Sequence, residues 1–266
     1  MKRYMLLLVS AMALFFGGGP SATEALQPKT ITVVYDNYPY KKGLTTAWGF
    51  SCLVRGWDKT ILFDTGGDGR LLLSNMEKLG IDPQEIETVV LSHIHGDHVG
   101  GLASLLHRHH KVTVVIPPSF PADFKEGVRR SGALVQEVAG FTELCGGVHT
   151  TGEMGISIKE QSLVLRTAQG LIVITGCAHP GVVQIVEAIK AHFKEDILLV
   201  MGGFHLSGEG RKEIQGIIAR LQEMGVKNVG PCHCSGEMAR KLFQEAYGKA
   251  CVPVGVGMEI NPEKLQ

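Results

Sequence analysis

The stretch that decides the fold is Ser92-His93-Ile94-His95-Gly96-Asp97-His98, in which three imidazoles and a carboxylate follow the spacing H-x-H-x-D-H. The residues just before it, 88–91, are β-branched or apolar and predict a short buried strand. Two histidines spaced i and i+2 beyond a strand can converge on one ion, while Asp97 and His98 turn toward a second. Imidazole and carboxylate ligands together suit Zn²⁺, and they also accept Fe or Mn. The motif therefore predicts a metal site rather than a histidine-rich surface loop.

Length and composition suit a globular protein with a large core. The chain has 266 residues, of which 44% are hydrophobic, and its 34 glycines indicate many tight turns. Lysine plus arginine and aspartate plus glutamate balance at 26 each, so no global charge favours nucleic acid or an anionic membrane. This overall balance does not exclude a local basic pocket. We expect a small-molecule substrate and no nucleic-acid partner.

The N-terminus has the pattern of a secretory signal peptide. Lys2-Arg3 supplies a positive start, and residues 4–16 form a largely apolar run that is short for a membrane span. Small residues follow, so that cleavage after Ala25 is expected. We predict a signal peptide over residues 1–25, a periplasmic or secreted protein, and no stable membrane span after cleavage. An uncleaved anchor is the alternative.

The six cysteines are too sparse for a disulfide scaffold, although one disulfide stays open. Cys52 and Cys251 lie in apolar, strand-like surroundings where buried free thiols are common. Three others, Cys177, Cys232 and Cys234, each lie within two residues of a histidine. Their position points to metal chemistry instead.

Strands and helices alternate along the rest of the chain. Strands are expected at residues 30–35, 50–54, 60–63, 88–91, 112–116, 163–166, 171–174, 197–201 and 226–229. Helices are expected at residues 71–79, 101–109, 182–193, 213–224 and 237–247. Histidines recur at strand ends in this mixture. The pattern predicts an α+β fold of two sheets packed face to face with helices outside.

Four further segments place polar side chains at the end of a strand. They carry Asp64 within Leu62-Phe63-Asp64-Thr65-Gly66-Gly67, Cys177 and His179 within Gly176-Cys177-Ala178-His179-Pro180-Gly181, His205 within Gly202-Gly203-Phe204-His205-Leu206, and His233 within Cys232-His233-Cys234-Ser235-Gly236. Each segment alone is a weak signal. Together they predict ligands gathered at one end of several strands, where a shared site can form.

These motifs resemble the metallo-β-lactamase superfamily. The resemblance rests on the Asp-Thr-Gly strand end, the S-H-x-H-x-D-H-x-G-G-L motif and the later histidines, and it covers residues 30–257. The three downstream segments are narrower and resemble the subgroup labelled dihydropterin ribofuranosylaminobenzene phosphate synthase-like hydrolases. The resemblance implies a four-layer αββα sandwich, a catalytic domain over residues 26–266, and two divalent metal ions at one edge of the sheets.

The resemblance also implies a ligand set for each ion. The first ion is expected on His93, His95 and His179, and the second on Asp97, His98 and His233. His149 is an alternative to His179 as the third ligand of the first ion. Asp64 is expected to orient a histidine rather than to bind metal.

Cys177 departs from the family pattern. Many members carry a bridging aspartate at the end of a strand that reads T-G-D, whereas this chain reads Thr175-Gly176-Cys177. A thiolate has the same single charge as aspartate but is softer, and it would favour zinc. In the alternative interpretation, Cys177 is a buried thiol that only orients His179.

The remaining candidates have both functional and structural interpretations. His205 is expected to face the substrate, either as an acid or as a hydrogen-bond donor to a phosphate. In the alternative interpretation, it is a loop residue whose side chain is satisfied by backbone groups. Three interpretations of Cys232 and Cys234 stay open: they pack in the core, they form a redox pair, or one of them is a further metal ligand. The histidines expected at the surface are His107, His109, His110 and His192.

The expected reaction follows from a two-ion centre. Two cations lower the pKa of a shared water, and the resulting hydroxide attacks phosphorus or a carbonyl carbon. Asp97 is expected to orient that water, and His205 to steady the leaving oxygen. A phosphoester or cyclic phosphate is the favoured substrate. A lactone or ester hydrolase is one alternative, and a non-catalytic metal-binding or redox sensor is another.

Overall fold

The structure is a computed structural model that describes residues 28–265. The predicted signal peptide at residues 1–25 lies outside the described residues. Within the described part of the chain, no helix is long and apolar enough to cross a membrane.

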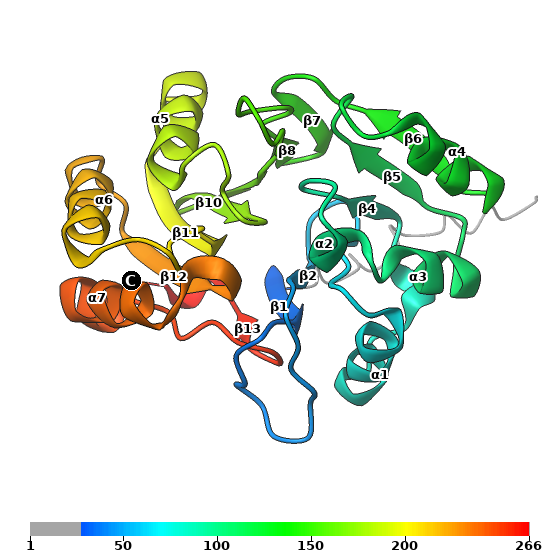
Figure 1. Ribbon diagram of the computed structural model, residues 1–266, viewed down its shortest axis with the longest axis horizontal. Coiled ribbons are helices and arrows are strands. Elements are labelled where there is room, and N and C mark those ends of the chain that lie inside the picture. Colours follow the sequence, from blue (N-terminus) through cyan, green and yellow to red (C-terminus); the bar gives the residue numbers. More distant parts are fainter. Residues whose placement is uncertain (1–27, 266) are drawn as a thin grey trace, which may run out of the picture.

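Two β-sheets form the centre of the molecule (Figure 1). The first has the order β13-β1-β2-β3-β4-β5-β6, with bounds β1 Thr30–Tyr35, β2 Ser51–Arg55, β3 Ile61–Phe63, β4 Thr88–Val90, β5 Thr113–Ile116, β6 Leu134–Glu137 and β13 Glu259–Ile260. The second has the order β12-β11-β10-β9-β8-β7, with bounds β7 Thr142–Cys145, β8 Val148–Thr150, β9 Leu163–Thr167, β10 Gly170–Thr175, β11 Ile197–Gly203 and β12 Asn228–Cys232. Each sheet is antiparallel on one side and parallel on the other, through β3 to β6 and through β10 to β12.

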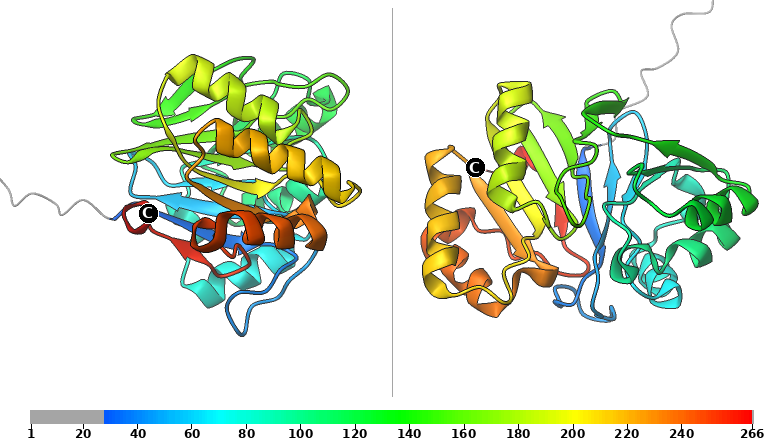
Figure 2. Two further views of the ribbon diagram at one scale, coloured as in Figure 1. Left: turned by 90° about the vertical axis from the view of Figure 1, so that its left-hand side faces the viewer. Right: turned by 45° about the horizontal axis from the view of Figure 1, so that its top comes forward.

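Helices cover the outer face of each sheet, as the opposite sides of Figures 1 and 2 show. Those beside the first sheet are α1 Gly69–Leu79, α2 Gly96–Val99, α3 Leu102–Arg108 and α4 Ala122–Arg130. Those beside the second are α5 Val182–Phe193, α6 Arg211–Glu223 and α7 Glu237–Tyr247. One apolar cluster fills the space between the sheets, and two more lie beneath the helix layers. This confirms the predicted α+β fold, a four-layer αββα sandwich.

The fourteen predicted elements are present, with ends shifted by up to about three residues. β11 continues to Gly203, and β12 begins at Asn228 rather than at residue 226. The sequence analysis missed α2, α4, β6, β7, β8 and β13. Helix α4 buries one residue, Val128, β6 is largely exposed and β7 is half-buried, so none of the three leaves a strong apolar period in the sequence. The two residues of β13 are too few to show a pattern.

The fold brings the carboxyl ends of the parallel strands to one edge of the sandwich. Asp64 follows β3 and the histidine motif follows β4, while Cys177, His205 and His233 follow β10, β11 and β12. In sheets of this kind, the crevice beyond the carboxyl ends of the strands is where ligands bind. Segments far apart in the sequence therefore meet at one edge because the strands before them are parallel.

Gln161 ties the two sheets together near this edge. It is fully buried just before β9, and its Nε2 donates to the carbonyl oxygens of Leu91 at 2.8 Å and Val115 at 3.2 Å. Its Oε1 accepts from the Thr150 hydroxyl at 2.5 Å. One amide thus satisfies buried polar groups of both sheets.

We expect Gln161→Leu to lower the free energy of unfolding of the metal-free protein by about 2 to 4 kcal/mol, because three buried polar groups would lose a partner. Urea denaturation measures this change. Gln169→Leu is the control, since its side chain lies in an exposed turn and should shift the value by less than about 0.5 kcal/mol. Equal stabilities for the two variants would contradict the bridging role of Gln161.

Candidate metal centre

Two groups of side chains able to hold a metal ion lie beside each other at the strand edge. The first group is His93, His95 and His179, and the second is Asp97, His98, Cys177 and His233. Within each group, the candidate ligand atoms lie within 4.8 Å of one another. The structure therefore brings together the six side chains of the two expected ligand sets, together with Cys177.

The first group consists of three imidazoles that have room for an ion between them. His93 Nε2 lies 3.1 Å from His95 Nδ1, and the His179 ring lies 4.8 Å from the ring of His93. Burial holds the pKa of His93 well below its usual range, and burial also lowers the pKa of His179 to about 4. Within the described residues, the buried Nε2 of His179 has no hydrogen-bond partner. Neutral imidazoles with a free nitrogen are the form that binds metal, so this group fits an ion.

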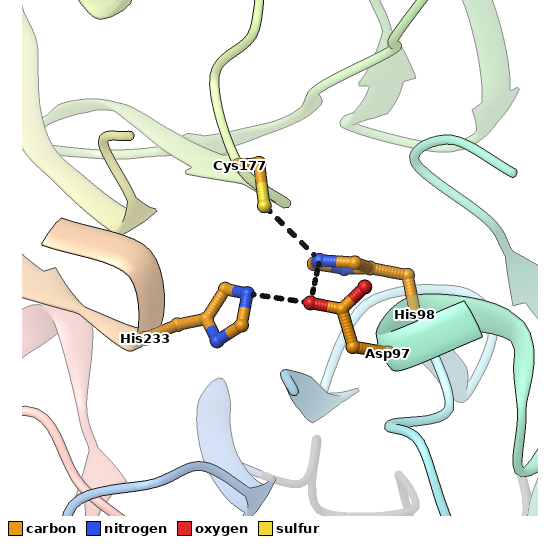
Figure 3. A group of neighbouring side chains, drawn as sticks. All are labelled: Asp97, His98, Cys177 and His233. Carbon is orange, nitrogen blue, oxygen red and sulfur yellow. Dashed lines mark hydrogen bonds and ion pairs between the residues drawn. The ribbon is translucent and has the colours of Figure 1, made fainter. Parts of the chain in front are cut away.

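The second group adds a carboxylate and a thiol (Figure 3). His233 Nε2 lies 3.2 Å from Asp97 Oδ2, and His98 Nε2 lies 3.2 Å from Cys177 Sγ. Burial opposes ionisation of Asp97, yet the contact with His233 and the charge of His98 hold its pKa well below its usual range. An ionised carboxylate, two imidazoles and a sulfur form a mixed donor set of the kind that zinc accepts.

The two ligand groups are in direct contact through one pair of imidazole rings. The ring centroids of His93 and His98 are 4.2 Å apart, and these side chains belong to different groups. Ions held by the two groups would therefore be near neighbours. This arrangement fits a dinuclear centre better than two independent sites.

Asp64 holds two of the histidines from the side of the first sheet. Its Oδ2 lies 2.7 Å from His98 Nδ1 and also accepts the hydroxyl of Ser92 at 2.7 Å. The same hydroxyl lies 2.9 Å from His93 Nδ1. Burial lowers the pKa of His98, but the Asp64 carboxylate outweighs burial and raises it. Asp64 thus contacts His98 as an orienting partner would, leaving Nε2 for the centre.

Glu160 holds the opposite loop from the side of the second sheet, and the sequence analysis missed it. This buried carboxylate accepts four successive backbone N–H groups: those of Gly176, Cys177 and Ala178 on Oε1 and that of His179 on Oε2, at 2.9 to 3.1 Å. Burial raises the pKa of Glu160, and the amide hydrogen bonds oppose that rise. The loop that carries two candidate ligands is therefore fixed by one side chain.

Asn37 is a second residue that the sequence analysis missed. Its Oδ1 lies 3.1 Å from His233 Nδ1, and its Nδ2 donates to the His233 carbonyl oxygen at 3.2 Å. The two contacts fix both the ring and the backbone of His233, which has a left-handed φ of +47°. Asn37 follows β1 with no motif around it, so only the folded chain reveals this role.

Backbone strain is concentrated at the same edge. Five non-glycine residues of the described chain have positive φ, and four of them, Asp64, Ala178, His205 and His233, lie in the loops of this site. Such conformations cost of order 1 to 3 kcal/mol each and persist where the surroundings hold them. Their clustering marks the strand edge as the functional part of the molecule.

Comparison with known proteins agrees with this geometry. The family model of the metallo-β-lactamase superfamily matches residues 49–203, more than half of the chain. The chain belongs to the metallo-β-lactamase superfamily. It is accordingly a metal-dependent enzyme of the hydrolase type found in that superfamily.

Three similar proteins illustrate the relationship. A 7,8-dihydropterin-6-methyl-4-(beta-D-ribofuranosyl)-aminobenzene-5'-phosphate synthase from Methanocaldococcus jannaschii is 28% identical over 268 residues, covering 82% of this chain and 91% of its own. Tm1679, described as a metal-dependent hydrolase of the β-lactamase superfamily, has 30% identity and a TM-score of 0.76, covering 87% of this chain and 98% of its own. A diphosphatase of the PhnP family shares the fold at 13% identity and a TM-score of 0.55, covering 87% and 97%.

His205 lies at the border of this superfamily centre. Its exposed ring is 4.4 Å from that of His179, and a third potential ligand group joins it to Cys177 and Cys234. A hydrogen bond with Cys234 raises the pKa of His205, against the effect of burial. A hydrogen bond with Cys234 also raises the pKa of the Cys177 thiol, as burial does. Cys234 therefore contacts the centre through two neighbours.

His149, the alternative to His179, lies outside both ligand groups. It belongs to β8, where its ring is 5.1 Å from Phe193 and its Nε2 is 3.8 Å from Glu143. That alternative is wrong, because the second sheet places residue 149 on a strand away from the carboxyl ends of β10 to β12.

The histidines predicted at the surface are exposed or half-buried, namely His107, His109, His110 and His192.

A groove of about 670 Å³ opens beside the centre. Its lining includes His179 and His205, the first turns of α5 and the facing side of α6. A slightly larger hollow of about 780 Å³ borders α1 and contains none of the candidate ligands. The groove next to His179 and His205 therefore adjoins the candidate ligands, whereas the hollow beside α1 does not. All six cysteines are free, and Cys52 and Cys251 are buried as predicted.

We expect Glu160→Gln to weaken zinc binding about 10- to 100-fold, because the amide keeps only one acceptor oxygen for four N–H groups and points donors at the rest. Metal affinity by chelator competition measures the change. Glu153→Gln is the control, since Glu153 accepts one N–H, from Ser119, on a partly exposed loop. Unchanged zinc affinity in Glu160→Gln would contradict the proposed anchoring.

Proposed function

We propose that this enzyme hydrolyses a small phosphoester or cyclic phosphate at a centre of two divalent ions, of which zinc fits the donors best. One ion would be held by His93, His95 and His179, and the other by Asp97, His98, Cys177 and His233. The observation that carries the proposal is the contact between these two groups through the rings of His93 and His98. Two adjacent ions are the arrangement used for displacement at phosphorus.

The preference for a phosphate substrate has a separate support. The relative from Methanocaldococcus jannaschii that matches most of the chain is named for a product that carries a 5'-phosphate. This similarity favours phosphate over a lactone among the substrates that the same centre could process.

When bound, the ions would lower the pKa of a water and stabilise the charge that develops on the attacked group. The protein supplies the rest. Asp97 is partly exposed at the centre, where its carboxylate can accept a hydrogen bond from the attacking water. Asp64 and Glu160 keep the imidazole ligands and the loop after β10 in place, so that little reorganisation accompanies the reaction.

His205 is placed to serve the leaving group. Its ring is exposed next to His179 and borders the groove between α5 and α6. A substrate bound across the first ligand group would bring its leaving oxygen toward this side. We propose that His205 donates a proton from its ring nitrogen to that oxygen as the bond breaks.

A metal-binding or redox sensor is the second candidate. The observation that favours it is the third group, Cys177, His205 and Cys234, which brings two thiols together beside the ligands. A sensor would bind metal in stoichiometric amounts without turnover.

We also propose that the protein is exported, because residues 1–25 have the pattern of a signal peptide. Determining the N-terminal residue of the purified mature protein tests this proposal.

We expect His95→Ala to lose both hydrolysis of bis(p-nitrophenyl) phosphate and one equivalent of bound zinc, because the first group would keep only two ligands. Turnover and elemental analysis of the same sample measure both. His107→Ala, an exposed histidine on α3, is the matched control. Full zinc content together with full activity in His95→Ala would refute the proposed centre, and tight zinc binding without turnover in the unaltered protein would favour the sensor.

We expect His205→Ala to lower kcat about 10²- to 10⁴-fold for a phosphodiester with an alkoxide leaving group, since general acid catalysis is then lost. The loss should be much smaller for p-nitrophenolate, which leaves without protonation. Zinc content should be unchanged. An equal loss for both leaving groups would exclude the acid role.

A further inference from the structure

Trp48 is an exposed aromatic side chain next to the candidate metal centre. It lies in the loop between β1 and β2, and 55% of its surface is exposed. Its ring centroid is 4.8 Å from that of His233, at an interplanar angle of 55°. A large apolar ring is thus kept at the surface, in contact with a buried candidate ligand.

The backbone around Trp48 is fixed to the centre. Ala47 N donates to the Asp36 carbonyl oxygen and Phe50 N donates to that of Asp97, both at 3.3 Å. Between them, Gly49 has φ +141°, and a Cβ there would lie 2.5 Å from the Asp97 carbonyl oxygen. This close approach requires glycine and places residue 48 directly beside Asp97. The indole therefore has a defined position relative to the reacting centre.

A second apolar side chain is exposed within the motif itself. Ile94 stands between the candidate ligands His93 and His95, and 37% of its surface is exposed. The centre consequently combines polar ligands inside with apolar side chains at its opening. Exposed apolar surface around a polar site indicates a ligand that carries an apolar group.

Trp57, the other tryptophan, has a structural role. Its Nε1 donates to the Arg166 carbonyl oxygen at 3.1 Å, and the Lys29 ammonium lies 5.0 Å from its ring centroid. It lies beyond the opposite end of β2 from Trp48. The contrast shows which of the two indoles is available to a ligand.

We propose that Trp48 is the stacking platform for a planar aromatic group of the substrate, so that the substrate class is an aryl or heteroaromatic phosphoester. The proposal rests on the hydrolase function proposed above and specifies its substrate. An aromatic ring gains from offset or edge contact with indole beyond the burial of area, which corresponds to about a two- to tenfold gain in affinity. An aliphatic group of similar charge gains no such contact.

The binding experiment uses the zinc-loaded Trp57→Phe variant, in which Trp48 is the remaining tryptophan of the two in the chain. Phenylphosphonate and methylphosphonate are the probes, because they share a phosphonate and differ in the ring. We expect phenylphosphonate to change the Trp48 emission and to bind about two- to tenfold more tightly. Equal affinities for the two probes would overturn the proposal.

Variants then assign the preference to Trp48, with affinities measured by calorimetry in the otherwise unaltered zinc-loaded protein. Trp48→Ala should bind both probes equally, and Trp48→Phe should retain most of the preference. Tyr40→Ala is the matched control, since Tyr40 is 54% exposed on the same loop. A preference that survives Trp48→Ala, or that is lost in Tyr40→Ala as well, would overturn the assignment.

A second pair of probes separates the two proposals. Benzoate and acetate carry a carboxylate in place of the phosphonate. If neither phosphonate binds but benzoate binds more tightly than acetate in a Trp48-dependent way, the phosphate substrate is wrong and the aromatic platform stands. If phosphonates bind without regard to the ring, the platform is wrong and the phosphate substrate stands. If no probe of either pair binds, the platform is also rejected.

Discussion

Two buried carboxylates, Asp64 and Glu160, hold the candidate metal centre together from opposite sheets. Asp64 follows β3 and binds the loop after β4 through Ser92 and His98. Glu160 precedes β9 and binds the loop after β10 through four backbone N–H groups. The two loops that these carboxylates hold carry most of the candidate ligands. Without them, parallel strands would bring the ligands to one edge but would not fix their directions.

This constraint also explains why so many imidazoles can be buried together. Burial keeps His93 and His179 neutral by lowering each pKa, whereas Asp64 supports a proton on His98. Buried carboxylates are costly unless they are hydrogen-bonded, and both of these are. The centre thus combines the neutral imidazoles of His93 and His179 with the ionised carboxylate of Asp97, and Asp64 lies behind His98. Such a set favours a cation at its middle.

The sequence predicted the ligands because ligand chemistry depends on the side chain and its place at a strand end. Asp64 could be assigned for the same reason. Glu160 and Asn37 could not, because they act on backbone groups and on a histidine 196 residues away, and neither leaves a motif. In the fold, the strongly periodic helices and most of the buried strands were predictable. Helix α4 and strands β6 and β7 were not, since each of them buries one residue or none.

Cys177 shows how far the chemistry of the site depends on its surroundings. Its sulfur lies within reach of His98 and belongs to both the second ligand group and the group with His205 and Cys234. Burial and Cys234 favour the thiol in the metal-free protein, so binding of an ion there must release its proton. A soft cation compensates for that release better than a hard one, because a metal–sulfur bond is strongest with thiophilic metals. As a ligand, the thiol would make the proposed second group more selective for zinc than an aspartate in its place would be.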